Sequence, residues 1–265
     1  MSLNWIDVTD LSINVLLLLE REQLSWLPGW LPETELGTAL KANPAVEWYL
    51  RNKNPDLNAW VDRVLQQANP DSTPEGTRQA ELTILRSIND LVVYAVNPQL
   101  YVDLPFQGWD SSELTNLADF SGKTVIDVGA GTGRLTFVAA EAGACPIFAV
   151  EPVGNLRVFI KETARKRGLE DVYTMDGLIT DIPFPANFCD IVMAGHVFGD
   201  HPEAEHAEMV RVLKPGGMVI LCPGNNDTDE GWHQFLVDQG FAWSLFEEPG
   251  DGMKRKYWKT VKPTL

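Results

Sequence analysis

The chain has 265 residues, 45% of them hydrophobic, and a formal net charge of −16 at pH 7. This length and apolar content suffice for one large domain or two small ones, each with a buried core. Proteins that neutralise many phosphates present a basic face, so the acidic balance excludes an extended phosphate-tracking surface, and nucleic acid is not an expected partner.

The three cysteines, Cys145, Cys189 and Cys222, lie far apart in apolar stretches. Their number and spacing match neither a disulfide framework nor a set of metal ligands, so we expect no metal and a reducing compartment. The apolar run "INVLLLLE" is much shorter than a membrane-spanning helix, and no basic segment typical of a signal peptide precedes it. A cytoplasmic protein without a membrane partner is the expectation.

Residues 1–118 have a helical hydrophobic period, with Leu11, Val15, Leu18 and Leu19 on one helix face. Thr73 and Pro74 have the residue types of a helix start, and we predict one helix from there to the residue before Asn97, because Pro98 disfavours helical backbone in the residue that precedes it. The segment "QQANPDSTPEG" is the expected long loop. These residues are predicted to form an N-terminal helical cap.

Residues 119–265 alternate short apolar runs with helical segments. The runs are "TVIDVGAG", "PIFAVEP", "DVYTMDG", "CDIVMAGHV" and "MVILCPG". Such runs separated by helices predict a parallel sheet that is covered on both faces. The last segment, "FAWSLFEEPGDGMKRKYWKTV", predicts an antiparallel hairpin at the sheet edge, with "KRKYWK" as a charged edge strand. The fold class is therefore α/β, a doubly wound, mostly parallel seven-stranded sheet of the Rossmann-like kind with an antiparallel C-terminal hairpin.

The first strand ends in a glycine-rich turn, where Gly129, Gly131 and Gly133 are spaced G-x-G-x-G. Ligands of doubly wound sheets bind outside the carboxyl ends of the strands, so this turn predicts a binding site. Glu151 ends the second strand, 151 − 131 = 20 residues after Gly131, where a carboxylate can accept the hydroxyls of a ribose. The spacing differs from the G-x-G-x-x-G of dinucleotide sites, and no Walker lysine follows.

From these segments the chain resembles the class I S-adenosylmethionine-dependent methyltransferases over about residues 119–265. The resemblance rests on "VIDVGAGTG", "VEP", Asp176 at the end of the third strand, "DIPFPANFCDIV" and "RVLKPGG". The last two segments look most like the small-molecule branch of that family. The resemblance implies S-adenosyl-L-methionine as cofactor and methyl transfer to a small-molecule acceptor by in-line displacement.

The resemblance also implies the cofactor contacts. Asp127 would orient the glycine loop and the amine of the methionine tail, and the Gly129–Ala130–Gly131 turn would approach that tail. Glu151 would bind the ribose, Pro152 would pack on the adenine face, Asp176 would accept from the adenine amino group, and the Gly177 backbone would meet the ring edge. Asp181 is the alternative to Asp176.

Candidates for a general base follow the fourth strand. His196 lies at the strand tip facing the cofactor cleft and is also a candidate for cofactor binding, and Asp200 and His201 follow it. We expect His206 and His233 to be surface residues. Upstream, Tyr101, Phe106 and Trp109 are candidates for an apolar lid that would bind the acceptor and enclose a sulfonium by cation–π attraction; packing between the helical part and the sheet is the alternative role for these aromatics.

Other functions stay open at this point. The chain could be a non-catalytic, regulatory nucleotide-binding module of the same fold, an NAD-type dehydrogenase, or an RNA methyltransferase. The glycine spacing disfavours the dehydrogenase, the acidic charge disfavours RNA, and the intact Asp127, Glu151 and glycines favour a working cofactor site. The sequence does not define the oligomeric state.

Overall fold

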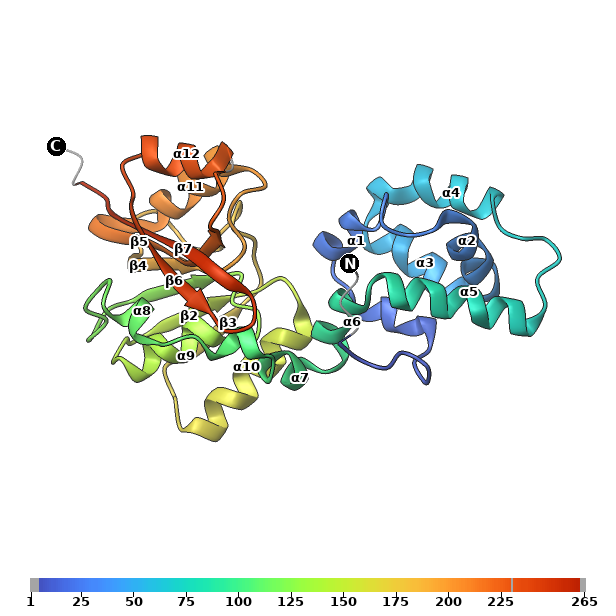
Figure 1. Ribbon diagram of the computed structural model, residues 1–265, viewed down its shortest axis with the longest axis horizontal. Coiled ribbons are helices and arrows are strands. Elements are labelled where there is room, and N and C mark those ends of the chain that lie inside the picture. The colour runs from blue at the N-terminus through green and yellow to red at the C-terminus, as the bar shows by residue number, and fades with distance from the viewer. Residues whose placement is uncertain (1–4, 230, 263–265) are drawn as a thin grey trace. The chain divides into compact units, whose positions relative to one another are not determined.

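The computed structural model describes residues 5–229 and 231–262, which fall into two compact units (Figure 1). One unit is helical, extends to Tyr101 and also includes Val153–Asn155; the other comprises Val102–Pro152 and the residues from Leu156 onward. The division therefore falls before the sequence boundary at residue 118, because residues 102–118 pack with the sheet. Among the described residues, no helix combines the length and apolar composition needed to cross a membrane.

The helices before the sheet are short, and those of the helical unit enclose a core of their own, to which Leu16, Leu40, Leu50 and Ile84 contribute fully buried side chains. Their bounds are η1 Ile13–Leu18, α1 Arg21–Trp26, α2 Glu33–Ala42, α3 Pro44–Lys53, η2 Pro55–Leu57, α4 Asn58–Gln66, α5 Pro74–Ser87, α6 Asn89–Val96, α7 Pro98–Val102, η3 Pro105–Gly108 and α8 Ser112–Thr115.

The helix start at Thr73 is confirmed. The Thr73 hydroxyl accepts a hydrogen bond from the Gly76 N–H at 3.1 Å, and Pro74 occupies the first helical position. The expected single helix is wrong, however: Ile88 leaves helical geometry, with φ −118° and ψ 27°, and divides the segment into α5 and α6. The end at Val96, before Asn97, agrees with the prediction.

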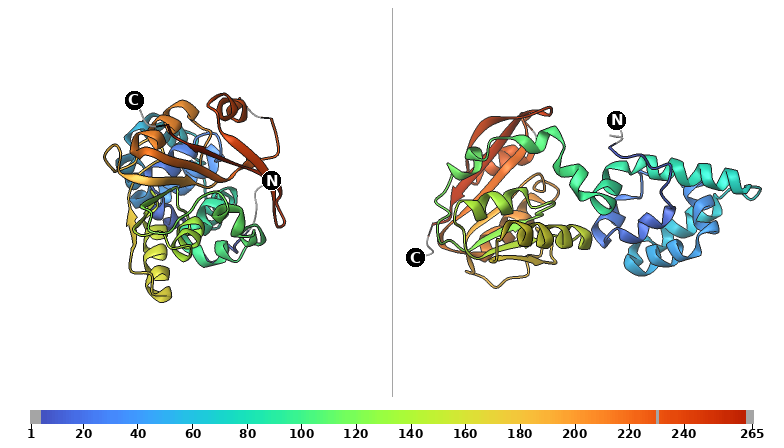
Figure 2. Two further views of the ribbon diagram at one scale, coloured as in Figure 1. Left: turned by 90° about the vertical axis from the view of Figure 1, so that its left-hand side faces the viewer. Right: turned by 90° about the horizontal axis from the view of Figure 1, so that it is seen from below.

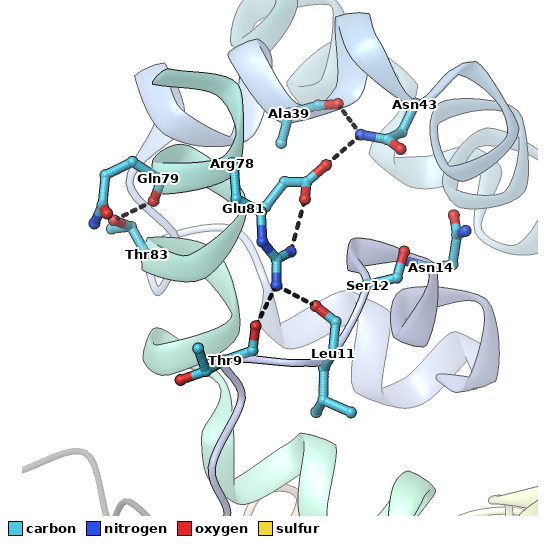
Figure 3. Close-up of polar contacts among 10 residues, drawn as sticks. All are labelled: Thr9, Leu11, Ser12, Asn14, Ala39, Asn43, Arg78, Gln79, Glu81 and Thr83. Atoms are coloured by element: carbon cyan, nitrogen blue, oxygen red, sulfur yellow. Dashed lines mark hydrogen bonds and ion pairs between the residues drawn. The ribbon is translucent and has the colours of Figure 1, made fainter. Parts of the chain in front are cut away.

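A polar cluster fastens the N-terminal segment to α5 (Figure 3). The Arg78 guanidinium donates to the carbonyls of Thr9 and Leu11, at 2.7 and 2.8 Å, and pairs with the Glu81 carboxylate at 2.9 Å. Glu81 in turn accepts a hydrogen bond from the Asn43 amide at 2.8 Å. One side chain thus satisfies carbonyls of a segment that has no regular structure of its own.

The sheet has seven strands in the order β3-β2-β1-β4-β5-β7-β6. β7 runs antiparallel to the other six strands. This confirms the predicted fold class. The strands are β1 Val125–Val128, β2 Ile147–Val150, β3 Val172–Met175, β4 Cys189–Ala194, β5 Leu213–Asn226, β6 Ala242–Glu248 and β7 Gly252–Thr260. The helices between them are α9 Arg134–Glu141, α10 Gly154–Arg167, α11 Pro202–Val212 and α12 Gly231–Asp238.

Helices cover both faces of the sheet, as its apolar strands require. Val125, Ile191 and Ile220 point to the face that α8 and α9 cover, and their neighbours Ile126 and Val192 point to the face that α11 and α12 cover. Figures 1 and 2 show the same arrangement, with α10 beside α9. Because β1, β2, β3 and β4 run parallel to one another, their carboxyl ends lie at the same edge of the sheet.

The hairpin is confirmed, but the charged-edge interpretation of "KRKYWK" is wrong. β7 lies between β5 and β6, so β6 forms the edge of the sheet. Lys254, Arg255 and Lys256 are buried, and each is paired with acidic side chains from other segments. The first three basic side chains of the run are thus buried cations whose nearest carboxylate partners are partly or largely exposed. The pairing is required because burying a charge is tolerated only when it is compensated.

Of the two histidines expected on the surface, His233 is buried and His206 is half-buried. His233 is 9% exposed, and its Nδ1 lies 2.8 Å from the Tyr257 hydroxyl. The His206 ring packs edge-on against Phe235 and Phe241, and burial lowers the pKa of its imidazole.

Candidate active site

The glycine turn between β1 and α9 has a backbone that favours glycine at three positions. The φ angles of Gly129, Gly131 and Gly133 are +65°, +55° and +87°, in the left-handed region that other residues avoid. A Cβ built on Gly131 would come no closer than 4.0 Å to another group, the Gly129 carbonyl oxygen. Packing therefore does not explain this glycine: its conformation does, and the space beside it is open.

Glu151 lies directly beside that turn. It follows the last residue of β2, is 4% exposed, and its Oε2 accepts a hydrogen bond from the Gly131 N–H at 2.8 Å. The N–H groups of Gly129 and Ala130 both donate to the Val150 carbonyl, at 2.8 and 3.1 Å. The end of β2 thus fixes the path of the glycine turn, and the carboxylate predicted to bind a ribose lies next to it.

Asp127 lies beneath the turn rather than on its surface. The side chain is 1% exposed and accepts a hydrogen bond from the Thr136 hydroxyl of α9 at 2.5 Å. Burial raises the pKa of this carboxyl to about 7, and the hydrogen bonds from Thr136 oppose the shift. Asp127 therefore joins β1 to α9; a contact with the amine of the methionine tail stays a prediction.

The third strand places Asp176 at its tip, with a side chain that is 74% exposed. Arg157 of α10 lies 3.3 Å from the Asp176 carboxylate and also donates to the carbonyls of Glu151 and Pro152, at 2.6 and 2.8 Å. One guanidinium therefore connects the ends of β2 and β3.

Gly177, next along the chain, is confined by packing. A Cβ there would lie 2.6 Å from Pro183 and 2.9 Å from Val150. The alternative acid, Asp181, is in a bridge with Leu178 beyond the strand end, with backbone hydrogen bonds of 3.0 and 3.3 Å. The structure therefore places Asp176, and not Asp181, where β3 ends.

The loop after β4 lies against the glycine turn. A Cβ on Gly129 would come within 2.5 Å of the Val197 Cγ1 atom, so the two segments touch at this point. His196, the residue before Val197, has the unusual φ of +58° for a side-chain-bearing residue, and its N–H donates to the Pro223 carbonyl at 3.0 Å. The loop thus meets the turn at Val197, one residue after His196; a contact of His196 with cofactor or acceptor stays a prediction.

The imidazole of His196 has a partner that the sequence did not reveal. Its Nε2 lies 2.9 Å from Oε1 of Glu248, a carboxylate at the end of β6 that is 1% exposed. The two residues are 52 positions apart, and in the sequence Glu248 is one of several acids around a turn. No local pattern distinguishes it.

Asp200 and His201 follow His196 in the same loop, and both are exposed. The buried Glu205 of α11 accepts hydrogen bonds from the N–H groups of Gly199 and His201, at 2.7 and 2.8 Å, and so fixes the loop path. The structure therefore brings together His196 and the glycine turn, with Asp200 and His201 at the solvent side.

The three aromatic residues predicted as a lid do not have a common environment. Trp109 is 3% exposed, packs edge-on against Phe246, and carries the Arg134 guanidinium 4.5 Å above its ring. Trp109 is therefore a core residue whose cation partner is Arg134, which differs from the predicted lid. Tyr101 contacts Tyr94 in the helical unit, and Phe106 lies half-buried in η3.

The comparisons with known proteins agree on a reaction class. Residues 126–221 match the family described as "Methyltransferase domain". An uncharacterized methyltransferase of Geobacillus thermodenitrificans is 29% identical over 160 residues, 59% of this chain and 71% of its own length. A demethylmenaquinone methyltransferase of a Geobacillus species is 28% identical over 130 residues, 48% of this chain and 56% of its own.

A protein-modifying relative is equally similar. The ribosomal protein arginine N-methyltransferase rmt3 of Schizosaccharomyces pombe is 30% identical over 225 residues, 80% of this chain and 39% of its own length. Among solved structures, an S-adenosylmethionine-dependent methyltransferase of Aquifex aeolicus superposes with a TM-score of 0.48 at 22% identity, over 61% of this chain and 95% of that one.

Proposed function

We propose that this chain, which belongs to the class I S-adenosylmethionine-dependent methyltransferases, transfers the methyl group to a small-molecule acceptor. Two observations support the acceptor class. The segments "IPFP" and "RVLKPGG" resemble the small-molecule branch of the family, and the net charge of −16 disfavours an RNA substrate. The similarity to a demethylmenaquinone methyltransferase is in line with it.

The residues at the strand ends fit S-adenosylmethionine. The open backbone at Gly131 leaves room for the methionine tail, and the buried Glu151 carboxylate, fixed 2.8 Å from the Gly131 N–H, is placed to accept from the ribose hydroxyls. Asp176, which pairs with Arg157, is the proposed partner of the adenine amino group. Pro152, whose carbonyl accepts from Arg157, would pack on the adenine ring, and the Gly177 backbone would meet the ring edge. The bound sulfonium supplies the methyl group.

The position of the loop after β4 carries the proposal. Val197 contacts the glycine turn, so His196 and the exposed Asp200 and His201 lie on the cofactor side of the sheet. Methyl transfer needs an acceptor held in line with the methyl group and shielded from water. This loop supplies polar side chains that can serve that purpose.

Methylation of arginine in protein is the alternative that the similarity to rmt3 favours. A transfer assay separates the two. The chain is incubated with tritium-methyl-labelled S-adenosylmethionine in three parallel reactions. These contain a filtered metabolite extract, total RNA and a protein extract, respectively. We expect label in the metabolite fraction. Label in the protein or RNA fraction alone would contradict the proposal.

A further inference from the structure

His196 and Glu248 form a hydrogen-bonded pair, and the next residue along the chain from His196, Val197, lies against the glycine turn. A carboxylate only accepts hydrogen bonds, so the 2.9 Å contact requires a proton on the His196 Nε2. In the neutral imidazole the lone pair then lies on Nδ1. The His196 side chain is 42% exposed, and within the described part of the chain its Nδ1 takes part in no hydrogen bond. The pair thus presents one basic nitrogen to a ligand.

The pair lies in a cluster of charged side chains. Glu248 is 1% exposed, and its second oxygen, Oε2, is buried without a hydrogen bond, 3.6 Å from the Lys254 ammonium. Lys254 also pairs with Asp251, at 2.8 Å, in the turn between β6 and β7. One ammonium thus faces two carboxylates. Glu205 of α11, bonded to the loop backbone, adds a further carboxylate.

We propose that His196 Nδ1 is the general base for an acceptor whose reacting group is a hydroxyl, and that Glu248 is its positioning residue. This inference rests on the proposed function and deepens it by naming the acceptor class. Glu248 does not touch the acceptor, because its carboxylate is buried; it fixes the tautomer of His196 and stabilises the imidazolium. The strained backbone of His196, with φ +58°, is of the kind that functional sites retain.

A hydroxyl matches this site better than an ammonium or a guanidinium. A single lone pair at Nδ1 accepts the single proton of an O–H group, whereas a cationic acceptor carries several N–H groups that carboxylates bind best. The carboxylate paired with His196 is buried, and the exposed Asp200 lies farther along the loop, at its solvent side. In the step, the acceptor oxygen forms a bond to the methyl carbon as the carbon–sulfur bond of the donor breaks. The sulfur keeps that electron pair, and the hydroxyl proton moves to Nδ1, giving a methyl ether, S-adenosylhomocysteine and imidazolium.

The test uses the full chain with S-adenosylmethionine and three sets of probes. The hydroxyl set is catechol, 4-hydroxybenzoate and the reduced form of 2-methyl-1,4-naphthoquinone; the amine set is glycine and phenethylamine; the third probe is an arginine–glycine-rich peptide. Products are identified by mass spectrometry. We expect methyl ethers from the hydroxyl set.

Two variants test the roles of the pair. His196→Gly suits the positive φ and should fold; we expect kcat to fall at least about 100-fold, the lower range for general-base catalysis, with partial rescue by added imidazole and an unchanged Kd for S-adenosylhomocysteine. Glu248→Gln should lower kcat about 10-fold and leave the KM for the acceptor unchanged. Glu247→Gln, exposed and one residue away, is the matched control.

Failure of the inference is distinguishable from failure of the proposed function. Methylation of the amines without any hydroxyl product would overturn the inference and leave the small-molecule proposal standing. Methylation of the peptide alone would overturn both. A His196→Gly variant that keeps the parental kcat, or that loses activity without any response to imidazole, would remove His196 as the base.

Discussion

The Glu151 carboxylate accepts a hydrogen bond from the Gly131 N–H at 2.8 Å, which joins the end of the second strand to the glycine turn of the first. The contact has two consequences. It fixes the backbone at the proposed binding site of the methionine tail, and it holds a nearly buried carboxylate at the same place. Residues 20 positions apart are therefore adjacent at the proposed cofactor site.

Replacing Glu151 by Ala should weaken the binding of S-adenosylhomocysteine by about 1.5–3 kcal/mol, the usual scale for hydrogen bonds to a charged group. Isothermal titration calorimetry measures the change. Glu162→Ala, an exposed acid on α10, is the control and should bind as the parent does. Parental affinity in a normally folded Glu151→Ala variant would place the ribose elsewhere.

Gly129→Ala should impair both folding and cofactor binding. The positive φ costs about 1–2 kcal/mol for a side-chain-bearing residue, and the new Cβ would lie 2.5 Å from Val197, an overlap that costs about 1–3 kcal/mol more. Gly122→Ala separates the two terms, because Gly122 has φ +66° and no atom within 4 Å of its Cβ position. Urea unfolding measures each variant.

The same contact offers a rescue. Val197→Ala removes the methyl groups nearest to the new Cβ, so the double variant should recover part of the stability and affinity that Gly129→Ala loses. Purely additive losses in the double variant would show that Val197 does not confine the turn.

Local patterns sufficed for the parts of the site that follow from strand order. The glycine spacing, the acid 20 residues later and the alternation of strands and helices predicted the turn, Glu151 and the sheet, because parallel strands bring their carboxyl ends to one edge. His196 was found in the same way, as a residue following the fourth strand.

Contacts between distant segments were not predictable in this way. Glu248 stands out from the neighbouring acids only through its hydrogen bond to His196, 52 residues earlier in the chain. Lys254 is buried because β7 lies between β5 and β6. A basic, alternating strand has the same pattern at an edge and in an interior position with ion pairs. Trp109 likewise has the sequence context of a lid residue, whereas in the structure it packs against Arg134 and Phe246.

The position of the domain boundary has a measurable consequence. Trp109 and Leu114 are buried in the core of the sheet unit, and Glu113 pairs with the buried Lys256 at 2.6 Å. A fragment of residues 119–265 lacks all three, whereas residues 102–265 retain them. We expect the shorter fragment to be less stable by at least about 4 kcal/mol, since each lost core side chain costs about 2–5 kcal/mol.

Thermal and urea unfolding of the two fragments by circular dichroism test this expectation. Trp109→Ala in the full chain serves as a check, because it removes the core side chain without shortening the protein. Equal stability of the two fragments would favour the boundary at residue 118.

Asp127 makes the stability of the protein depend on pH. Burial raises the pKa of its carboxyl to about 7 in the folded state, against 3.8 for the exposed group, so the unfolded chain releases this proton at lower pH than the folded one does. The stability that the protonated Asp127 contributes is complete below pH 4 and is lost progressively as the pH rises to about 7, above which it is constant.

Asp127→Asn cannot titrate, and its amide oxygen can still accept from Thr136. The difference in unfolding free energy between variant and parent should therefore change by about 2.5 kcal/mol in favour of the variant between pH 5 and pH 8. Urea unfolding at one-unit pH intervals measures the difference, in which the titration of all other groups cancels. A difference that stays constant across this range would mean that Asp127 is ionised in the folded protein throughout, with a compensating donor stronger than the Thr136 hydroxyl.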